Sequence, residues 1–373
     1  MTASERWVLQ FCHGYDGPFM DCARQYAALF AGTPYKVCTV YLTGAPSDEV
    51  VHGSASDEVV FLDYSSREVR GLKLAAIRDI RRLVGRRQFV LCIAHRFKPI
   101  YVALLGTVLP VIGVHHAFGD YKRRSRQLFA NLYRKRLALL AVSNAVRDDI
   151  RACLPDWPAE RIETLYNRID VEAVQAEQIS HGAARAFLGL PEHAWIVGNV
   201  GRLHPDKDQA TLIRGFAQAL PELPANSLLA IMGCGQLETS LQALAASLGV
   251  AEQVRFLGQI PHGRRYFKAF DLFALTSDHE PFGMVLLEAM AAGLPVIASD
   301  CGGGPEVVGD VGQLFPHGDG SALAALFISH SLSPWREGER TIERLRQRFS
   351  DRCSMQRFWS LPMTAGVLAQ ATR

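Results

Sequence analysis

Residues 280–299 read EPFGMVLLEAMAAGLPVIAS, and this stretch indicates the architecture of the whole chain. Pro281 and Gly283 mark a turn, and the apolar run after them predicts a helix that begins near Gly283. Apolar runs lie on either side of this helix, at 272–275 and 296–298, and short runs that are apolar throughout are typical of strands buried on both faces. A helix between two such strands is the repeating unit of an α/β fold with a parallel sheet.

The same alternation of apolar runs and helical patterns occurs twice along the chain. The first series of expected strands is 7–12, 37–42, 59–62, 89–94, 111–114 and 137–142, and the second is 196–200, 228–232, 254–257, 272–275, 296–298 and 313–315. We therefore expect an α/β fold with two Rossmann-like domains, over 1–175 and 176–349, and a helical segment, 350–373, that packs back on the first domain. Because ligands bind beyond the carboxyl ends of parallel strands, the site is expected in a cleft across which the two domains face each other.

Composition excludes several classes of protein. The chain has 373 residues, of which 49% are hydrophobic and 21% charged, as in a folded globular protein. Its eight cysteines form no C-x-x-C pair, so neither a zinc site nor a redox motif is indicated. The start lacks a secretory pattern, and the least polar stretch, 100–114, is shorter than the roughly 20 residues that span a membrane. We therefore expect a cytoplasmic location.

Positive charge is concentrated in the first half of the chain. Residues 1–172 contain 24 Lys and Arg against 18 Asp and Glu, a net charge of +6, whereas the remainder has a net charge of −3. Within this half, Lys122–Arg136 carries seven cations with Leu128, Phe129, Leu132 and Tyr133 between them. A basic amphipathic helix of this kind suits the anionic inner leaflet of a membrane, although a solvated helix face has the same pattern. No nucleic-acid reader motif accompanies the charge, so a nucleic-acid partner is not expected.

Two carboxylates flank the start of the helix near Gly283. The first N–H groups of a helix have no partner within it and can bind phosphate. Glu280 precedes this helix, and Glu288, four residues after Met284, leans back toward its start. Carboxylates are poor ligands for phosphate, so hydroxyl groups beside the phosphate are their natural partners, as in a sugar and a ribose. A loop carboxylate near a helix dipole is the alternative interpretation of Glu280.

Two cations follow the first strand of the second series. Residues 198–208 read GNVGRLHPDKD and place Arg202 and Lys207 after the expected strand at 196–200. A guanidinium fork and an ammonium group together suit a diphosphate, and they stabilise the charge that develops on a departing diphosphate. A solvated loop with two cations remains the alternative.

These motifs together resemble the retaining group 1 (family 4) glycosyltransferases, including transferases that build the lipopolysaccharide core. Residues 280–299 are similar to the family's E-x7-E signature, and Gly201-Arg202-Leu203 with Lys207 resembles its G-R-L-x-x-x-K motif. The resemblance implies the glycosyltransferase B fold, with an acceptor-side first domain and a donor-binding second domain. The implied donor is a nucleoside-diphosphate sugar, with UDP-glucose as our specific hypothesis, and no cofactor is expected.

The resemblance also assigns a role to each donor-side residue. It implies that Arg202 and Lys207 hold the diphosphate, that Glu288 binds the ribose diol, and that Glu280 contacts hydroxyls of the transferred sugar. Backbone groups of the Phe282-Gly283-Met284 segment complete the implied donor site.

In the first domain the resemblance points to a histidine and a glycine loop. A family histidine that approaches the sugar after a strand matches His115 or His116, and strand register favours His116. Gly17 matches the position at which the backbone approaches phosphate or acceptor, although the loop 13–18 lacks the family's adjacent glycine pair. The implied catalytic group is His116, Glu280, Arg202 and Lys207.

The resemblance finally implies a mechanism. Retention in this family is explained by front-face attack, in which the departing phosphate accepts the acceptor's proton, because no motif supplies a carboxylate nucleophile. No D-x-D motif is present, so we expect metal independence. The expected function is hexose transfer to a lipopolysaccharide-core or other lipid-linked envelope glycan, with the protein peripheral to the cytoplasmic face of the inner membrane. A hydrolysing nucleotide-sugar epimerase of similar fold and a non-catalytic glycan-binding scaffold are the alternatives.

Overall fold

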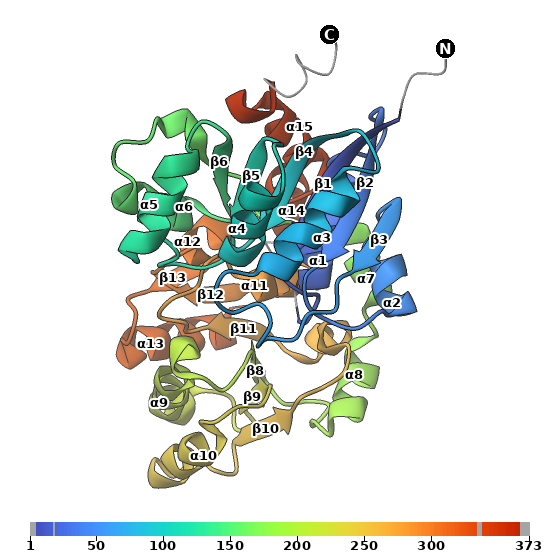
Figure 1. Cartoon of the computed structure of the whole chain (residues 1–373). Coiled ribbons are helices and arrows are strands. Elements are labelled where there is room, and N and C mark those ends of the chain that lie inside the picture. The colour runs from blue at the N-terminus through green and yellow to red at the C-terminus, as the bar shows by residue number, and fades with distance from the viewer. Residues whose placement is uncertain (1–4, 18, 334–337, 366–373) are drawn as a thin grey trace. The chain divides into compact units, whose positions relative to one another are not determined.

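The computed structural model describes residues 5–17, 19–333 and 338–365. The chain divides into two compact units, one formed by residues 1–167 with 351–373 and the other by residues 168–350 (Figure 1). The second unit thus begins at Arg168, ahead of the boundary near residue 175 that the sequence suggested. Each unit is an α/β unit with one parallel sheet, and each is described by itself below.

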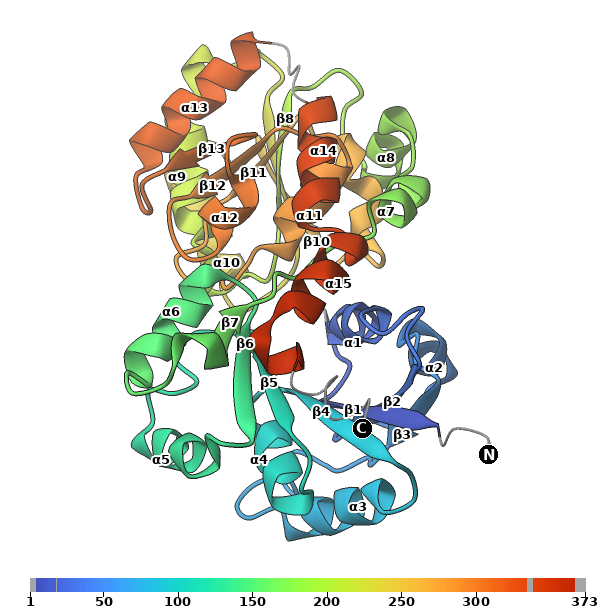
Figure 2. The same cartoon turned by 90° about the horizontal axis from the view of Figure 1, so that it is seen from above.

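The first unit is built on a seven-stranded sheet in the order β3-β2-β1-β4-β5-β6-β7, and its strand pairs are parallel. Its strands are β1 (Arg6–Cys12), β2 (Tyr35–Tyr41), β3 (Glu58–Phe61), β4 (Phe89–His95), β5 (Val111–His115), β6 (Leu137–Ala141) and β7 (Ile162–Thr164). Its helices are α1 (Phe19–Ala28), α2 (Asp48–Gly53), α3 (Leu74–Val84), α4 (Phe97–Gly106), α5 (Arg124–Tyr133), α6 (Asn144–Cys153) and α15 (Asp351–Ser360). Helices cover both faces of the sheet, with α3 and α4 on one face and α1 and α15 on the other (Figure 2).

Helix α15 joins the first unit although it follows the second unit in the chain. Its Phe358 is fully buried in the core cluster that contains Val8, Leu91 and Tyr26. The indole N–H of Trp359 donates a hydrogen bond of 2.9 Å to the Leu29 carbonyl, which fixes the helix against α1. The apolar faces of this helix and of the sheet are therefore buried against each other, which is the main source of its stability.

The second unit is built on a six-stranded sheet in the order β10-β9-β8-β11-β12-β13, also with parallel pairs. Its strands are β8 (Ile196–Val200), β9 (Leu228–Met232), β10 (Val254–Gly258), β11 (Leu272–Leu275), β12 (Val296–Ser299) and β13 (Gln313–Phe315). Its helices are α7 (Val171–Glu177), α8 (His181–Leu188), α9 (Gln209–Ala219), α10 (Glu238–Ser247), α11 (Met284–Ala291), α12 (Gly304–Val308), α13 (Gly320–Leu332) and α14 (Gly338–Arg348). Helices α9 and α13 pack together on one face, where Phe216 and Phe327 are fully buried.

Both sheets arise where apolar runs occur in the sequence, and one strand was not expected. Strand β7 is only three residues long, and its central residue is Glu163, so no apolar run marked it. It pairs with β6 at the edge of the first sheet. Within the part of the chain that the structure describes, no helix is long and apolar enough to cross a membrane.

Candidate active site

The donor-side residues lie at the topological switch point of the second sheet. The chain proceeds from β8 to β9 and β10 in one direction, and then from β11 to β12 and β13 in the other. In open parallel sheets, ligands bind at such a point, beyond the carboxyl ends of the two strands where the direction reverses. Lys207 follows β8 and Glu280 follows β11, so these two segments are brought together by the strand order.

Lys207 and Glu280 form an ion pair at this point. The Lys207 Nζ atom lies 2.6 Å from Glu280 Oε2, and the two side chains are 18% and 12% exposed. The Ser277 hydroxyl donates to the same carboxylate oxygen over 3.2 Å. The Thr276 hydroxyl donates to the Lys207 carbonyl over 2.9 Å, which ties the two loops together through the backbone as well. A cation and a carboxylate are thus fixed side by side in a largely buried position.

Arg202 lies in the same loop as Lys207 but in a different environment. Its side chain is 71% exposed, and among the residues that the structure describes its ion-pair partner is Asp206, at 3.3 Å. Asp206 also contacts His204, so this carboxylate bridges two residues of the loop. Because an exposed ion pair contributes at most about 1 kcal/mol, Arg202 can exchange Asp206 for another anion at small cost.

Two glycines hold the Arg202 loop against the strand β9 segment. Gly201 N–H donates to the Met232 carbonyl over 3.0 Å, and Leu203 N–H donates to the Cys234 carbonyl over 3.0 Å. A Cβ atom on Gly233 would collide with the Gly201 carbonyl, and one on Gly235 would collide with that of Leu203. The Gly233-x-Gly235 pattern therefore permits close approach of two backbones.

The loop from Glu280 to Gly283 is supported in the same way. Gly303 N–H donates to the Glu280 carbonyl over 2.7 Å. A Cβ atom on Gly302 would collide with that carbonyl, and one on Gly303 would lie 2.5 Å from the Pro281 carbonyl oxygen. The position of Glu280 thus depends on the glycines that follow β12.

Helix α11 begins directly after this loop. Its N-cap is Gly283, whose φ of 100° lies in the left-handed region that glycine adopts without strain. No described side chain caps the helix, and the Leu286 N–H donates to the Gly283 carbonyl over 2.9 Å, so the N–H groups of Met284 and Val285 are the ones available to an anion. Phe282 is buried against Phe349 and anchors the turn, and Glu288 lies half-buried one turn into the helix.

The two adjacent histidines of the first unit have different environments. His115 ends β5 and is fully buried, with Nδ1 at 2.7 Å from Asp120 Oδ2 and Nε2 at 3.2 Å from the Tyr121 hydroxyl. His116 follows the strand and is half-buried. Both nitrogens of His115 therefore have hydrogen-bond partners within the core of the first unit, and His116 is the more exposed of the two residues.

His116 forms a stacked pair with a second histidine. Its Nε2 lies 3.1 Å from His95 Nδ1, the ring centroids are 5.4 Å apart, and its Nδ1 is 4.0 Å from Cys22 Sγ. Burial, with smaller contributions from the charges of His115 and Arg96, lowers the pKa of His116 to about 3. Burial likewise lowers the pKa of His95 well below its usual value. Both rings are consequently neutral at physiological pH, and His116 can exchange a neutral hydrogen bond but carries no charge.

Gly17 lies in the loop after β1, in the first unit. It is exposed, with a φ of 60°, and a Cβ atom there would meet nothing within 4 Å. The requirement for glycine is therefore conformational, and the space beside it is open. The loop follows one strand of the switch point of the first sheet, which lies between β1 and β4.

The basic stretch Lys122–Arg136 contains helix α5, and its side chains divide into two groups. Arg126 pairs with Asp120 at 2.7 Å, and Arg136 donates to the Leu104 and Thr107 carbonyls over 3.0 Å each. Leu128 and Leu132, in contrast, are 71% and 76% exposed, one turn apart on the helix. Two of the seven cations thus stabilise the fold, and two leucines face solvent.

Comparison with known proteins identifies the family. A family model described as "Glycosyl transferases group 1" matches residues 181–348, and one described as "Glycosyltransferase Family 4" matches residues 21–173. The chain belongs to the group 1 glycosyltransferases. The first match lies within the second unit and includes the donor-side residues. The second match includes His116 and ends just beyond the boundary of the first unit.

Relatives and solved structures are consistent with this membership. The D-inositol 3-phosphate glycosyltransferase of Corynebacterium glutamicum is 31% identical over 256 residues, which are 56% of this chain and 60% of that protein. The chain spans about half the length of the curated relatives that it matches. Anabaena Alr3699/HepE in complex with UDP-glucose has a TM-score of 0.73 at 20% identity, and the lipopolysaccharide outer core galactosyltransferase WaaB has 0.69 at 18%. Each alignment covers 98% of this chain and 99% of the other, and they show the glycosyltransferase B fold.

Sequence reasoning missed several polar groups of this glycosyltransferase's candidate site. Thr276 and Ser277 directly follow β11, and a hydroxyl residue just beyond the carboxyl end of a buried strand was a signal that could have been used. Asp206 was passed over because it stands among charged neighbours in the loop. The described residues include no group of three metal-ligating side chains.

Proposed function

We propose that this protein transfers a hexose, with retention and without a metal ion, from UDP-glucose to an envelope glycan. The observation that carries the proposal is the ion pair of Lys207 and Glu280 at the switch point of the second sheet, beside the uncapped start of α11. The pair offers a cation for phosphate and a carboxylate for hydroxyls within 2.6 Å of each other, which suits the junction between a diphosphate and a sugar. The UDP-glucose complex of Alr3699/HepE, a protein of the same fold, supports the choice of donor.

In the proposed reaction the diphosphate is the leaving group. Lys207, Arg202 and the first N–H groups of α11 hold it and stabilise the negative charge that grows as the bond to the anomeric carbon breaks. The acceptor hydroxyl attacks from the same face, and its proton passes to the departing phosphate oxygen. The new glycosidic bond therefore keeps the original configuration. Because three positive groups converge on the diphosphate, the proposal assigns no step to a metal ion.

The remaining residues bind and orient the donor and the acceptor. Glu288 accepts hydrogen bonds from the ribose diol, and Glu280 accepts them from hydroxyls of the transferred sugar. His116, which is neutral, exchanges a hydrogen bond with the sugar or the acceptor after its Nε2 atom leaves His95. Gly17 provides open space for the acceptor in the first unit.

We further propose that the acceptor is carried on or near an anionic membrane surface, such as a lipopolysaccharide core at the inner leaflet. The support is the exposed pair Leu128 and Leu132 on helix α5, with cations at both ends of the helix. WaaB, of the same fold, is a lipopolysaccharide outer core galactosyltransferase. Surface attraction of about 1 kcal/mol per cation gives reversible, peripheral attachment rather than insertion.

A flotation assay tests the membrane proposal. The protein should float with phosphatidylglycerol vesicles at low salt and should be released from them by high salt. It should not float with phosphatidylcholine vesicles. Replacing Arg123, Arg124, Arg134 and Lys135 with Gln should abolish flotation, because Arg126 and Arg136 are engaged within the fold and are best left in place. If wild-type protein does not bind anionic vesicles at low salt, α5 is a solvated surface helix and the membrane proposal is wrong.

A donor-hydrolysis screen across sugar nucleotides tests the main proposal. UDP-glucose should release UDP faster than other UDP-hexoses and than GDP or ADP sugars, and EDTA should not change the rate. A faster reaction with another nucleotide sugar would show that the proposed donor is wrong and would identify the donor. Failure to hydrolyse or to bind any nucleotide sugar would reject the enzymatic proposal.

A further inference from the structure

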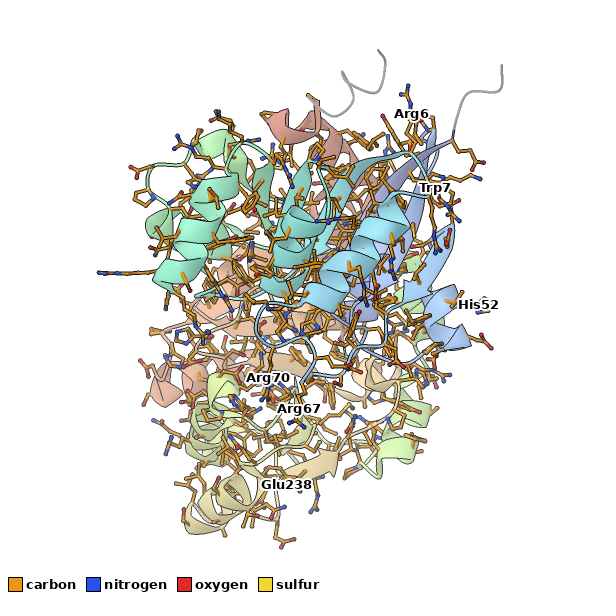
Figure 3. All side chains as sticks on the ribbon, in the orientation of Figure 1. Arg6, Trp7, His52, Arg67, Arg70 and Glu238 are labelled. Carbon is orange, nitrogen blue, oxygen red and sulfur yellow. The ribbon has the colours of Figure 1, made fainter. Side chains whose placement is uncertain are left out.

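Five basic residues gather at one end of the first unit without acidic partners. Arg96 directly follows β4, Lys98 lies in the first turn of α4, and Arg67, Arg70 and Lys73 belong to the segment between β3 and α3. Among the residues that the structure describes, none of the five forms an ion pair. Figure 3 shows Arg67 and Arg70 at the end of this unit opposite Arg6, the first residue of β1. They therefore lie at the carboxyl ends of the strands.

The electrostatics place Lys98 at the centre of this group. Burial first, and then the charges of Arg96 and Arg70, lower the pKa of Lys98. The pKa of Lys73 is lowered by burial and then by Lys98 and Arg126. Lys98 is thus coupled to Arg96, Arg70 and Lys73, and none of these four cations forms an ion pair with a described carboxylate.

His13, in the loop after β1, joins the same group. Its pKa is lowered chiefly by burial, the charges of Lys98 and Arg96 lower it further, and the charge of Asp16 opposes them in part. The group accordingly extends across the point between β1 and β4 where the strand order of the first sheet reverses. Like-charged side chains repel one another, so an arrangement of this kind is favourable only when an anion binds to it.

Aromatic rings hold two of these cations in place. The Arg96 guanidinium lies 5.0 Å from the centre of the Phe19 ring, and the Lys73 ammonium lies 4.8 Å from the centre of the Tyr101 ring. Arg96 also has a φ of 71°, an uncommon backbone conformation for a residue other than glycine. Arg96 is the N-cap of α4, whose dipole adds positive potential at the same place. The nearby carboxylate Glu68 is occupied by the backbone and hydroxyl of Ser65.

We propose that Lys98, Arg70 and Arg96 bind a phosphate or diphosphate group of the acceptor. This inference rests on the proposed function, because it names the chemical class of the acceptor for the same reaction. Guanidinium groups bind phosphate oxygens in pairs, and an ammonium group adds a point charge, so a dianionic phosphate matches the set better than a carboxylate. The acceptor is therefore an anionic phosphate ester, either soluble or carried on a lipid.

Calorimetry with inorganic pyrophosphate tests the proposal on the full chain saturated with UDP, which occupies the donor site. Wild-type protein should bind pyrophosphate, and the double variant Arg70→Gln, Lys98→Gln should bind it at least about tenfold more weakly. The matched control Arg82→Gln, Arg86→Gln removes two exposed cations, one in the last turn of α3 with a 3.8 Å contact to Asp79 and one just beyond the helix, and should bind as wild type does. An equal loss in both double variants would overturn the proposal, because the effect would then come from net charge alone.

The UDP titration separates this inference from the proposed function. A chain that binds UDP but no pyrophosphate keeps its proposed donor and refutes the anion site. A chain that binds pyrophosphate but no UDP refutes the donor assignment, while the anion site stands. Vesicles of phosphatidylcholine with phosphatidic acid then identify the source of the anion. Binding that the Arg70→Gln, Lys98→Gln variant loses assigns it to a lipid headgroup, and pyrophosphate binding without vesicle binding assigns it to a soluble ester.

Discussion

Replacing Lys207 by Ala should reduce both the stability of the second unit and the rate of transfer. Lys207 and Glu280 are 18% and 12% exposed, so the variant leaves a carboxylate that is largely buried and retains only the Ser277 hydroxyl. Losing one partner of a fully buried pair costs about 3–5 kcal/mol. Partial exposure and the remaining hydrogen bond reduce this to an expected loss of about 1–3 kcal/mol.

The matched variant Arg202→Ala should behave differently. Arg202 is 71% exposed and its ion pair with Asp206 contributes at most about 1 kcal/mol, so its removal should leave stability nearly unchanged. Both variants lose a charge-assisted contact to the diphosphate, worth about 1.5–3 kcal/mol, and should therefore transfer sugar roughly 10- to 100-fold more slowly.

Thermal unfolding and initial-rate measurements distinguish the two variants. Lys207→Ala should lower the melting temperature by roughly 2–10 °C, and Arg202→Ala by no more than a degree or two. The double variant Lys207→Met, Glu280→Gln should recover much of the stability without recovering activity, because no unpaired charge remains. An unchanged melting temperature in Lys207→Ala would refute the reasoning from burial, and full activity in either single variant would remove that residue from the diphosphate site.

Three further predictions concern the carboxylates, a histidine and a glycine. Glu288→Ala should weaken binding of UDP alone in calorimetry, whereas Glu280→Ala should leave UDP affinity nearly unchanged and lower turnover; equal weakening would contradict the division of roles. Because the folded pKa of His116 lies near 3 and the unfolded value near 6.5, the unfolded state binds the proton first as pH falls, so stability should decline below about pH 6.5, by about 1–2 kcal/mol at pH 5. Denaturant titrations at pH 7 and 5 should show a smaller decline in the free energy of unfolding for His116→Gln than for wild type. An identical decline would show that another group takes up the proton. Gly303→Ala should push a Cβ atom against the Pro281 carbonyl and lower turnover several-fold with UDP-glucose, and wild-type kinetics would show that the loop tolerates the shift.

The extent of prediction from sequence differs between the fold and the site. Twelve strands could be expected because each is an apolar run, but β7 could not, since Glu163 interrupts it. The contact between Lys207 and Glu280 joins residues 73 positions apart, and only the strand order, with β8 beside β11, brings them together. Strand register in the sequence favours His116 over His115, but the hydrogen bonds of His115 to Asp120 and Tyr121 have no signature in the sequence.

The geometry of the Lys207–Glu280 pair explains how one ion pair can serve two parts of a donor. The hydrogen bonds that Glu280 receives from Lys207 and Ser277 both end on Oε2, so in the proposed reaction Oε1 can accept a sugar hydroxyl without breaking either. An ammonium group has three donors, and the one directed at Glu280 leaves two for phosphate oxygens. The pair can therefore persist when the donor binds, and it would fix the distance between the diphosphate and the sugar across the bond that breaks. Glu280 then positions Lys207 at the bond that breaks and is not needed for UDP affinity, which predicts that Glu280→Gln lowers turnover, with UDP affinity nearly unchanged, even with donors that lack the hydroxyl it contacts.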